Sequence, residues 1–153
     1  QYIIDYRAMK HRIFLTILLS GFACLLHAQQ GLNVNELFIG KLVSREQMVE
    51  VRVKGRALSK YNLNFYHSIR FKANEKQCNE VDKYVERDRK MAVGTEQTSR
   101  NNVSTLIMSL PQQGGLYRYL CYLTQRKGRD TLVTLVYMEG NVASIAELRK
   151  LIH

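Results

Sequence analysis

Five stretches of this chain carry apolar residues in the pattern of β-strands, and they constrain the fold more than any other feature. In the first, Val49, Val51 and Val53 alternate with charged residues, which predicts a half-buried strand with the valines facing inward. In the second, Leu63, Phe65, His67, Ile69 and Phe71 share one face. The predicted strands are residues 48–54, 63–72, 103–110, 116–124 and 131–138.

The joints between the last three runs have the composition of β-hairpin turns. Residues 111–115 and 125–130 both contain glycine, which the tight turns of antiparallel hairpins favour. The run 131–138 is apolar on both faces, which is typical of a strand in the middle of a sheet.

Three helices are predicted from the spacing of their first residues. Asn33 with Glu36, Asn74 with Gln77, and Ser144 with Glu147 each have the three-residue spacing of a capping box. We expect a short helix over 32–38, a long helix that begins after Asn74 and ends by Gly94, and a final helix at the C-terminus. The polar residues 95–102 are predicted to form a loop.

Together these elements predict an α+β fold in the order α-β-β-α-β-β-β-α. An antiparallel sheet of about five strands would carry two main helices packed on it. The chain has 153 residues, and no linker or repeat divides it. We therefore expect a single α+β domain over residues 29–153.

The N-terminal residues have the layout of a secretory signal peptide over residues 9–28. A basic start at Lys10 and Arg12 precedes the short apolar stretch 13–26, and cleavage is expected after Ala28. Residues 1–8 lie upstream of the first methionine and are interpreted as an over-extended start. Lipidation of Cys24 is a less favoured alternative, because Gly21 and Phe22 do not fit a lipobox. This layout predicts export to the periplasm or cell envelope of a Gram-negative bacterium, with no membrane span in the mature chain.

Several short motifs also resemble one known family. They are residues 31–38, 51–61, 67–71, 120–122, 136–140 and Glu147-Leu148. With these motifs the chain resembles a family of small exported proteins of unknown function from Bacteroidales-type bacteria. The resemblance implies a bacterial envelope protein, and it implies no catalytic residue.

Few residues are available for chemistry. Removal of the signal peptide leaves only His67 and His153 as histidines, and no Cys or His pair has the short spacing of a metal site. We expect no metal and no cofactor. His67 with Cys121 is the single candidate for a nucleophile and its base. Cys78 and Cys121 form either a disulfide between the long helix and the sheet or two buried free thiols.

The surplus of positive charge is the most function-like feature. The formal net charge is +10, and residues 74–100 hold equal numbers of basic and acidic side chains, so the surplus lies in the predicted strands. A basic sheet face would suit an anionic envelope component or an acidic protein partner better than a nucleic acid, given the predicted export. The candidate binding residues are Arg52, Lys54, Tyr66, Arg70, Lys72, Arg126, Lys127 and Arg129.

Three functions remain open on the sequence alone. The favoured one is a non-enzymatic binding or interaction module that uses this basic face. A small exported hydrolase using His67 and Cys121 is the first alternative. The second alternative is an assembly subunit that pairs with another chain through a sheet edge. The oligomeric state is left open.

Overall fold

A computed structural model describes residues 31–152, so the predictions on the signal peptide, on Cys24 and on residues 1–8 lie outside the described residues. The elements are α2 Asn35–Phe38, η1 Arg45–Gln47, β1 Val49–Lys54, η2 Gly55–Tyr61, β2 Leu63–Ala73, α3 Glu75–Arg89, β3 Gly94–Arg100, β4 Val103–Gln113, β5 Leu116–Lys127, β6 Asp130–Gly140 and α4 Ile145–Ile152.

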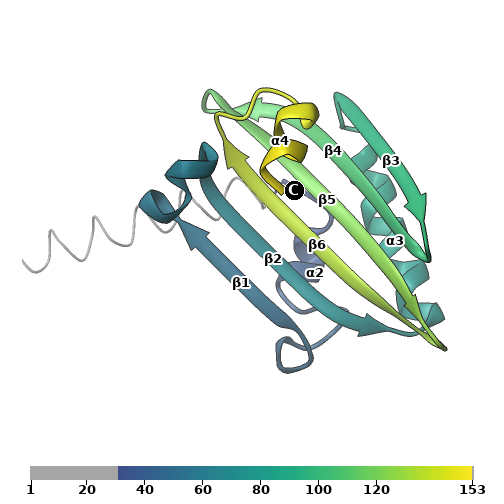
Figure 1. Ribbon diagram of the computed structural model, residues 1–153. Coiled ribbons are helices and arrows are strands. Elements are labelled where there is room, and N and C mark those ends of the chain that lie inside the picture. The colour runs from purple at the N-terminus through teal and green to yellow at the C-terminus, as the bar shows by residue number, and fades with distance from the viewer. Residues whose placement is uncertain (1–30, 153) are drawn as a thin grey trace, which may run out of the picture. The chain divides into compact units, whose positions relative to one another are not determined.

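The strands form one antiparallel sheet in the order β1-β2-β6-β5-β4-β3 (Figure 1). The predicted α+β class and the antiparallel pairing are confirmed. The apolar strand β6 lies between β2 and β5, as its composition on both faces predicts. The sheet has six strands rather than about five.

The additional strand is β3, in the segment predicted to be a polar loop. It pairs along its whole length with β4, from Gly94 opposite Ser109 to Arg100 opposite Val103. It lies at the edge of the sheet, and most of its side chains are exposed. An edge strand with both faces in water needs no apolar alternation, so the pattern that identifies the other strands is absent here.

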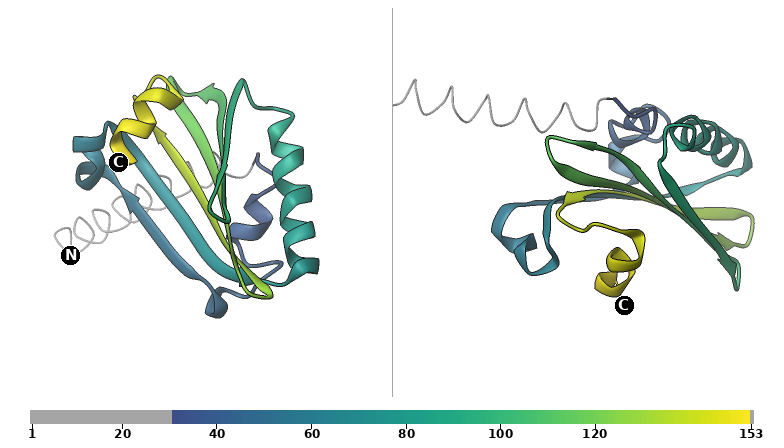
Figure 2. Two further views of the ribbon diagram at one scale, coloured as in Figure 1. Left: turned by 45° about the vertical axis from the view of Figure 1, so that its right-hand side comes forward. Right: turned by 90° about the horizontal axis from the view of Figure 1, so that it is seen from above.

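Helices lie on both sides of the sheet (Figure 2). We call the side against α2 and α3 the α3 face, and the side against α4 the α4 face. The pairing register places on the α3 face Phe65, His67, Ile69, Phe71, Leu106, Met108, Leu120, Val133, Leu135 and Tyr137. It places on the α4 face Tyr66, Arg70, Thr105, Ile107, Tyr119, Cys121, Leu123, Thr134, Val136 and Met138.

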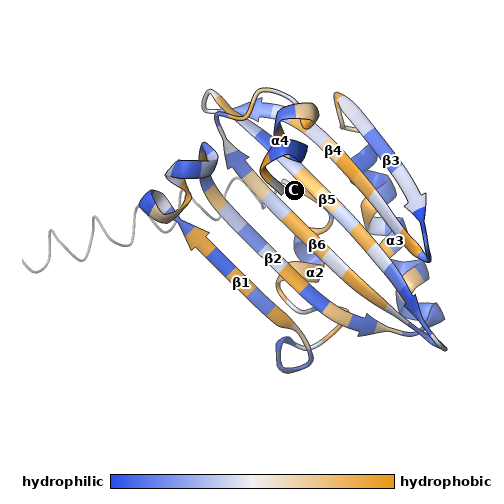
Figure 3. Cartoon of the chain, viewed as in Figure 1, coloured by the Kyte–Doolittle hydropathy of each residue, from blue (hydrophilic) through white to orange (hydrophobic). Residues whose placement is uncertain are grey.

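The first strand is largely exposed on both faces, whereas the sequence predicts that its valines face inward. Val49 and Val51 lie on the α4 face with 65% and 44% of their surface exposed, whereas Glu50, Arg52 and Lys54 lie on the α3 face (Figure 3 shows the alternation). β1 is the other edge of the sheet. Alternation therefore identifies the strand correctly, but it does not show that this edge strand is largely exposed on both faces, with only Val53 partly buried.

In two of the three predicted capping boxes, the side chain of the first residue accepts from the backbone N–H three residues later, as expected. The Asn74 side chain accepts from the backbone N–H of Gln77, and the Gln77 side chain accepts from the N–H of Asn74. At α4 the Ser144 hydroxyl accepts from the N–H of Glu147, and the Glu147 carboxylate accepts from the N–H of Ala143. Both helices thereby satisfy N–H groups that their first turns leave unpaired.

The predicted cap at Asn33 is wrong, because a buried carboxylate from α3 replaces it. Asp88 is fully buried, and its oxygens accept from the Asn33 N–H at 2.7 Å, the Asn33 Nδ2 at 2.8 Å and the Val34 N–H at 2.9 Å. The short helix α2 starts at Asn35 without a side-chain cap of its own. Asp88 therefore joins the start of α2 to the end of α3.

Candidate functional site

A groove of about 570 Å³ lies on the α4 face and is the main candidate site. It crosses the sheet from β2 to β3 and reaches one side of α4. Its lining consists of Tyr66, Arg70, Thr98, Thr105, Ile107, Cys121, Leu123, Thr134, Val136, Met138 and Arg149. The pairing register arranges most of these side chains in two adjacent rows across the sheet. One row contains Arg70, Thr134, Leu123 and Thr105, and the next contains Val136, Cys121 and Ile107.

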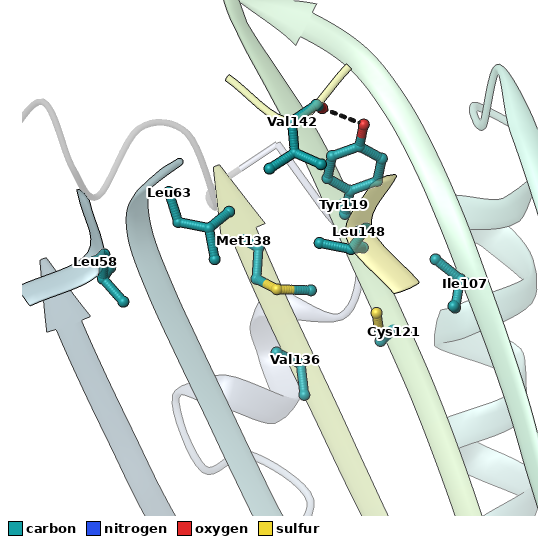
Figure 4. Close-up of a cluster of buried hydrophobic side chains, with 9 residues drawn as sticks. All are labelled: Leu58, Leu63, Ile107, Tyr119, Cys121, Val136, Met138, Val142 and Leu148. Atoms are coloured by element: carbon teal, nitrogen blue, oxygen red, sulfur yellow. Dashed lines mark hydrogen bonds between the residues drawn. The ribbon is translucent and has the colours of Figure 1, made fainter. Parts of the chain in front are cut away.

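The deep end of the groove is a hydrophobic cluster beneath α4 (Figure 4). Leu148 of α4 is completely buried against the cluster that contains Ile107, Cys121, Val136 and Met138. The Tyr119 hydroxyl also donates to the backbone oxygen of Val142, which holds the segment leading into α4 against the sheet. The apolar floor is therefore built on paired strands and is covered by α4 at one end.

An ion pair joins α4 to the far edge of the sheet. Arg149 Nη2 lies 2.6 Å from Glu96 Oε2 of β3, and both side chains are about two-fifths exposed. At that exposure the pair adds little stability, roughly 0–1 kcal/mol. Its geometric effect is to place the Arg149 side chain along the groove, where it forms part of the lining.

A cationic side chain stands on the other side of the groove. Arg70 of β2 is exposed, and its Nε lies 3.3 Å from the Thr134 hydroxyl, so the side chain leans across the neighbouring strand β6. Lys72 follows two residues later on the same face and is also exposed. The groove therefore combines an apolar floor with a positively charged rim.

The eight basic and aromatic residues predicted to form one binding face do not lie on one face. Arg52, Lys54 and Arg126 lie on the α3 face, whereas Tyr66, Arg70, Lys72 and Lys127 lie on the α4 face, and Arg129 is in the hairpin turn between β5 and β6. The Arg52 guanidinium is 3.5 Å from Glu50. The prediction of a single basic face is thus corrected to a smaller basic group beside the groove.

The hydrolase candidates His67 and Cys121 lie on opposite faces of the sheet. His67 is 1% exposed, and its Nε2 lies 2.7 Å from Glu50 Oε1. Burial raises the pKa of the Cys121 thiol to about 12, so it is protonated at neutral pH and is a weak nucleophile. These two side chains cannot act on the same substrate atom, which removes the geometric basis of the hydrolase hypothesis.

The same arrangement excludes the disulfide alternative. Cys78 lies on α3 and Cys121 faces α4, with the sheet between them. Both cysteines are free thiols in the structure. A disulfide needs Cα atoms within roughly 7 Å and side chains that point toward one another.

A second cavity of about 600 Å³ lies between α3 and the strands β3 to β6. Several of its polar groups are already engaged with protein partners. The Tyr122 hydroxyl donates to Asp82 at 2.7 Å, and Arg89 lies 3.2 Å from Glu86. Burial, with the Asp82 carboxylate beside it, raises the pKa of Tyr122 well above its ordinary value. Because these polar groups already have protein partners, we take the groove on the α4 face as the main candidate site.

His67 makes stability depend on pH in a predictable direction. Burial lowers its pKa below 6.5, outweighing the hydrogen bond to Glu50 that raises it; Arg52 and Arg45 lower it further. The unfolded chain therefore takes up a proton first as the pH falls through 6.5, so the free energy of unfolding should decrease below that pH. In His67→Gln this decrease should be smaller, as measured by urea unfolding from about pH 7.5 to about pH 5. An equal decrease in both proteins would show that His67 is not the source of this pH dependence.

Comparison with known proteins places the chain in a family. A family of unknown function, DUF6108, matches residues 21–152. The chain belongs to DUF6108. No curated protein matches this DUF6108 sequence. The structure of ORF14 from Sulfolobus Islandicus Filamentous Virus aligns with 63% of the DUF6108 chain and 71% of its own, at 7% identity and a TM-score of 0.32, which is too low to carry an argument.

Two kinds of feature are missing from the described part of the DUF6108 chain. Within residues 31–152 there is no helix of the length and hydropathy needed to cross a bilayer. The same residues contain no group of three or more His, Cys, Asp or Glu side chains that could hold a metal ion.

Sequence reasoning misses most of the groove. The binding residues predicted from the sequence do not include Ile107, Val136 or Arg149, although alternation in β4 and β5 places Thr105 with Ile107 and Cys121 with Leu123. That signal assigns residues to a common face, but it does not show which face a helix leaves open. The position of α4 decides this point.

Proposed function

We propose that this DUF6108 protein is an exported, non-enzymatic binding module of the cell envelope that holds an anionic amphiphile on its α4 face. The apolar part of the ligand would lie over the groove floor, and its acidic group would meet Arg70 and Lys72. The observation that carries the proposal is the groove itself, in which an apolar floor ends beside an exposed arginine.

The floor supports the apolar half of the proposal. Leu123 is half-buried, and Ile107 and Val136 lie beside it at the bottom of the groove. An alkyl chain covering these side chains would gain about 25 cal/mol for each Å² of apolar surface removed from water. A cavity of about 570 Å³ is within the size range of small-molecule sites.

The rim supports the anionic half. An arginine side chain presents a planar set of donors that fits a carboxylate or a phosphate in a bidentate manner. Arg70 is exposed and its hydrogen bond goes to the neutral hydroxyl of Thr134, so an anion would not displace a carboxylate from this contact. Lys72 adds a second positive charge on the same strand and face.

The predicted signal peptide supports the location. Residues 9–28 would direct the chain out of the cytoplasm to the cell envelope, where it would meet amphiphilic membrane components. A single-chain anionic amphiphile is the simplest ligand that uses both the floor and the rim.

The proposal is tested by calorimetric titration of the purified protein with dodecyl phosphate, kept below its micelle concentration. We expect Arg70→Glu to weaken binding about tenfold or more, because the lost charge-assisted contact is replaced by repulsion. Leu123→Glu should weaken it similarly by making the floor polar. Binding should also weaken as salt is raised.

The matched control is Arg87→Glu, which makes the same change of charge on the exposed side of α3, on the other face of the sheet. It should leave the affinity unchanged. Neutral dodecanol should bind more weakly than the phosphate. Absence of binding, or equal affinity in Arg70→Glu and the unmodified protein, would contradict the proposal.

A further inference from the structure

Strand β1 is an edge of the sheet, and none of its residues belongs to the groove lining. In the part of the chain that the structure describes, β1 has a neighbouring strand, β2, on one side only. Its valines face the α4 side and stay exposed, 65% for Val49 and 44% for Val51. Exposed valines on an unpaired edge are the arrangement that sheet proteins usually avoid, because such an edge can add another strand.

The two edges of the sheet differ in this respect. β3, the opposite edge, has the sequence GTEQTSR and presents polar or charged side chains with no large apolar residue. β1 has the sequence VEVRVK, with three valines on one face and three charged residues on the other. The apolar edge is therefore confined to β1.

The order of charges on β1 favours a second copy of the same strand. In an antiparallel pair about a two-fold axis at Val51, Val51 faces Val51, and Val49 faces Val53 of the second copy. In the same register Glu50 lies opposite Arg52, and this contact occurs twice. Directly opposed side chains share one face of the sheet, and opposite charges there attract.

The neighbouring registers lack this complementarity. An axis at Glu50 would place two glutamates opposite each other, and an axis at Arg52 would do the same with two arginines. Directly opposed like charges destabilise a strand pair. We compare only pairings that keep the α4 faces of both copies on one side of the joined sheet. Of the axes at residues 50, 51 and 52, only the axis at Val51 brings opposite charges together.

We infer that β1 pairs with β1 of a second copy in this register, so that two sheets join into one. The valines of both copies would then form a continuous apolar strip beside the two grooves. Glu50 retains its contact with His67, because a carboxylate can accept from more than one donor. This inference does not depend on the ligand proposed for the groove.

The first test measures the mass of the protein in solution by sedimentation velocity. The protein is recovered from the periplasm of a Gram-negative host, and mass spectrometry identifies its N-terminus. We expect a dimer that dissociates on dilution. Val51→Lys places two lysines opposite each other at the axis and should raise the dimer dissociation constant at least about tenfold. The matched control is Val93→Lys, a valine 72% exposed outside β1, which should still form the dimer.

The second test reports the register. In a Cys78→Ser background, Val51→Cys should cross-link to itself on mild oxidation, since opposed Cβ atoms lie about 5 Å apart. Val49→Cys should not, because two copies of that residue lie four positions apart, about 13 Å along the strand. A monomer at all concentrations, an unaffected dimer in Val51→Lys, or equal cross-linking in the Val49→Cys and Val51→Cys variants would each overturn the inference.

Discussion

Gly140→Ala is expected to lower the free energy of unfolding by about 3 kcal/mol, because the added methyl group would enter occupied space. A Cβ at this position would lie 2.3 Å from the backbone oxygen of Asn62 and 2.7 Å from Leu63 Cα. These are backbone atoms, so no flexible side chain can move aside. The Asn62 oxygen also accepts from the Asn141 N–H at 2.8 Å, which fixes it in place.

The position of Gly140 explains why the clash is costly. Gly140 ends β6 and pairs with both Leu63 and Tyr117, at the point where the register between β2 and β6 shifts. Any movement that relieves the contact must also disturb Leu63, which belongs to the cluster beneath α4.

Urea unfolding of the two proteins measures the effect, and Gly94→Ala is the matched control. Gly94 also lies in a strand, but its added Cβ would meet only Ser109 Cβ at an ordinary 3.8 Å. That variant should change stability by less than about 1 kcal/mol. If both variants lose the same stability, the cost does not come from the close approach at Asn62.

Asp88→Ala is expected to lower the free energy of unfolding by a similar amount, roughly 3 kcal/mol. The alanine would remove the acceptor for two backbone N–H groups and one side-chain amide, and Val34 is completely buried. A buried donor left without an acceptor costs roughly 1–3 kcal/mol. The start of α2 has no side-chain cap of its own that could compensate.

Two variants on the same helix separate this role from a general effect of charge. Glu86→Ala removes an exposed carboxylate whose ion pair with Arg89 is also exposed, so it should change stability by less than about 1 kcal/mol. Asp88→Asn keeps one acceptor oxygen, so its loss of stability should lie between those of Asp88→Ala and Glu86→Ala. Equal stability of Asp88→Ala and Glu86→Ala in urea unfolding would show that the Asp88 contacts contribute little.

Much of the architecture is local enough to be predicted. Hairpin glycines, alternating apolar residues and the capping pair Asn74–Gln77 act over a few residues, so they predict five strands, the long helix and the central place of β6. The edge strand β3 is missed because its two solvated faces need no apolar residues. The α2 cap is mispredicted because its acceptor, Asp88, comes from another helix fifty-five positions along the chain from Asn33.

The candidate site depends on contacts that are remote in sequence. Alternation alone places Arg52 and Arg70 on the outer sides of their strands, yet the pairing register puts them on opposite faces of the sheet. The same register separates His67 from Cys121. A period of two residues assigns each side chain to one of two faces, but which faces of neighbouring strands coincide depends on the register between them.

The sequence by itself thus determined the fold class, the antiparallel pairing and most element positions, because propensity, alternation and turn chemistry are properties of short segments. The tertiary structure alone decided on which faces the basic residues lie, that the cysteines stay apart, and that a groove opens on the sheet beside α4. The first of these features depends on the register between neighbouring strands, the second on register and on the packing of α3, and the third on where α4 packs. Helix packing is set by the summed burial of residues from all strands rather than by any one segment.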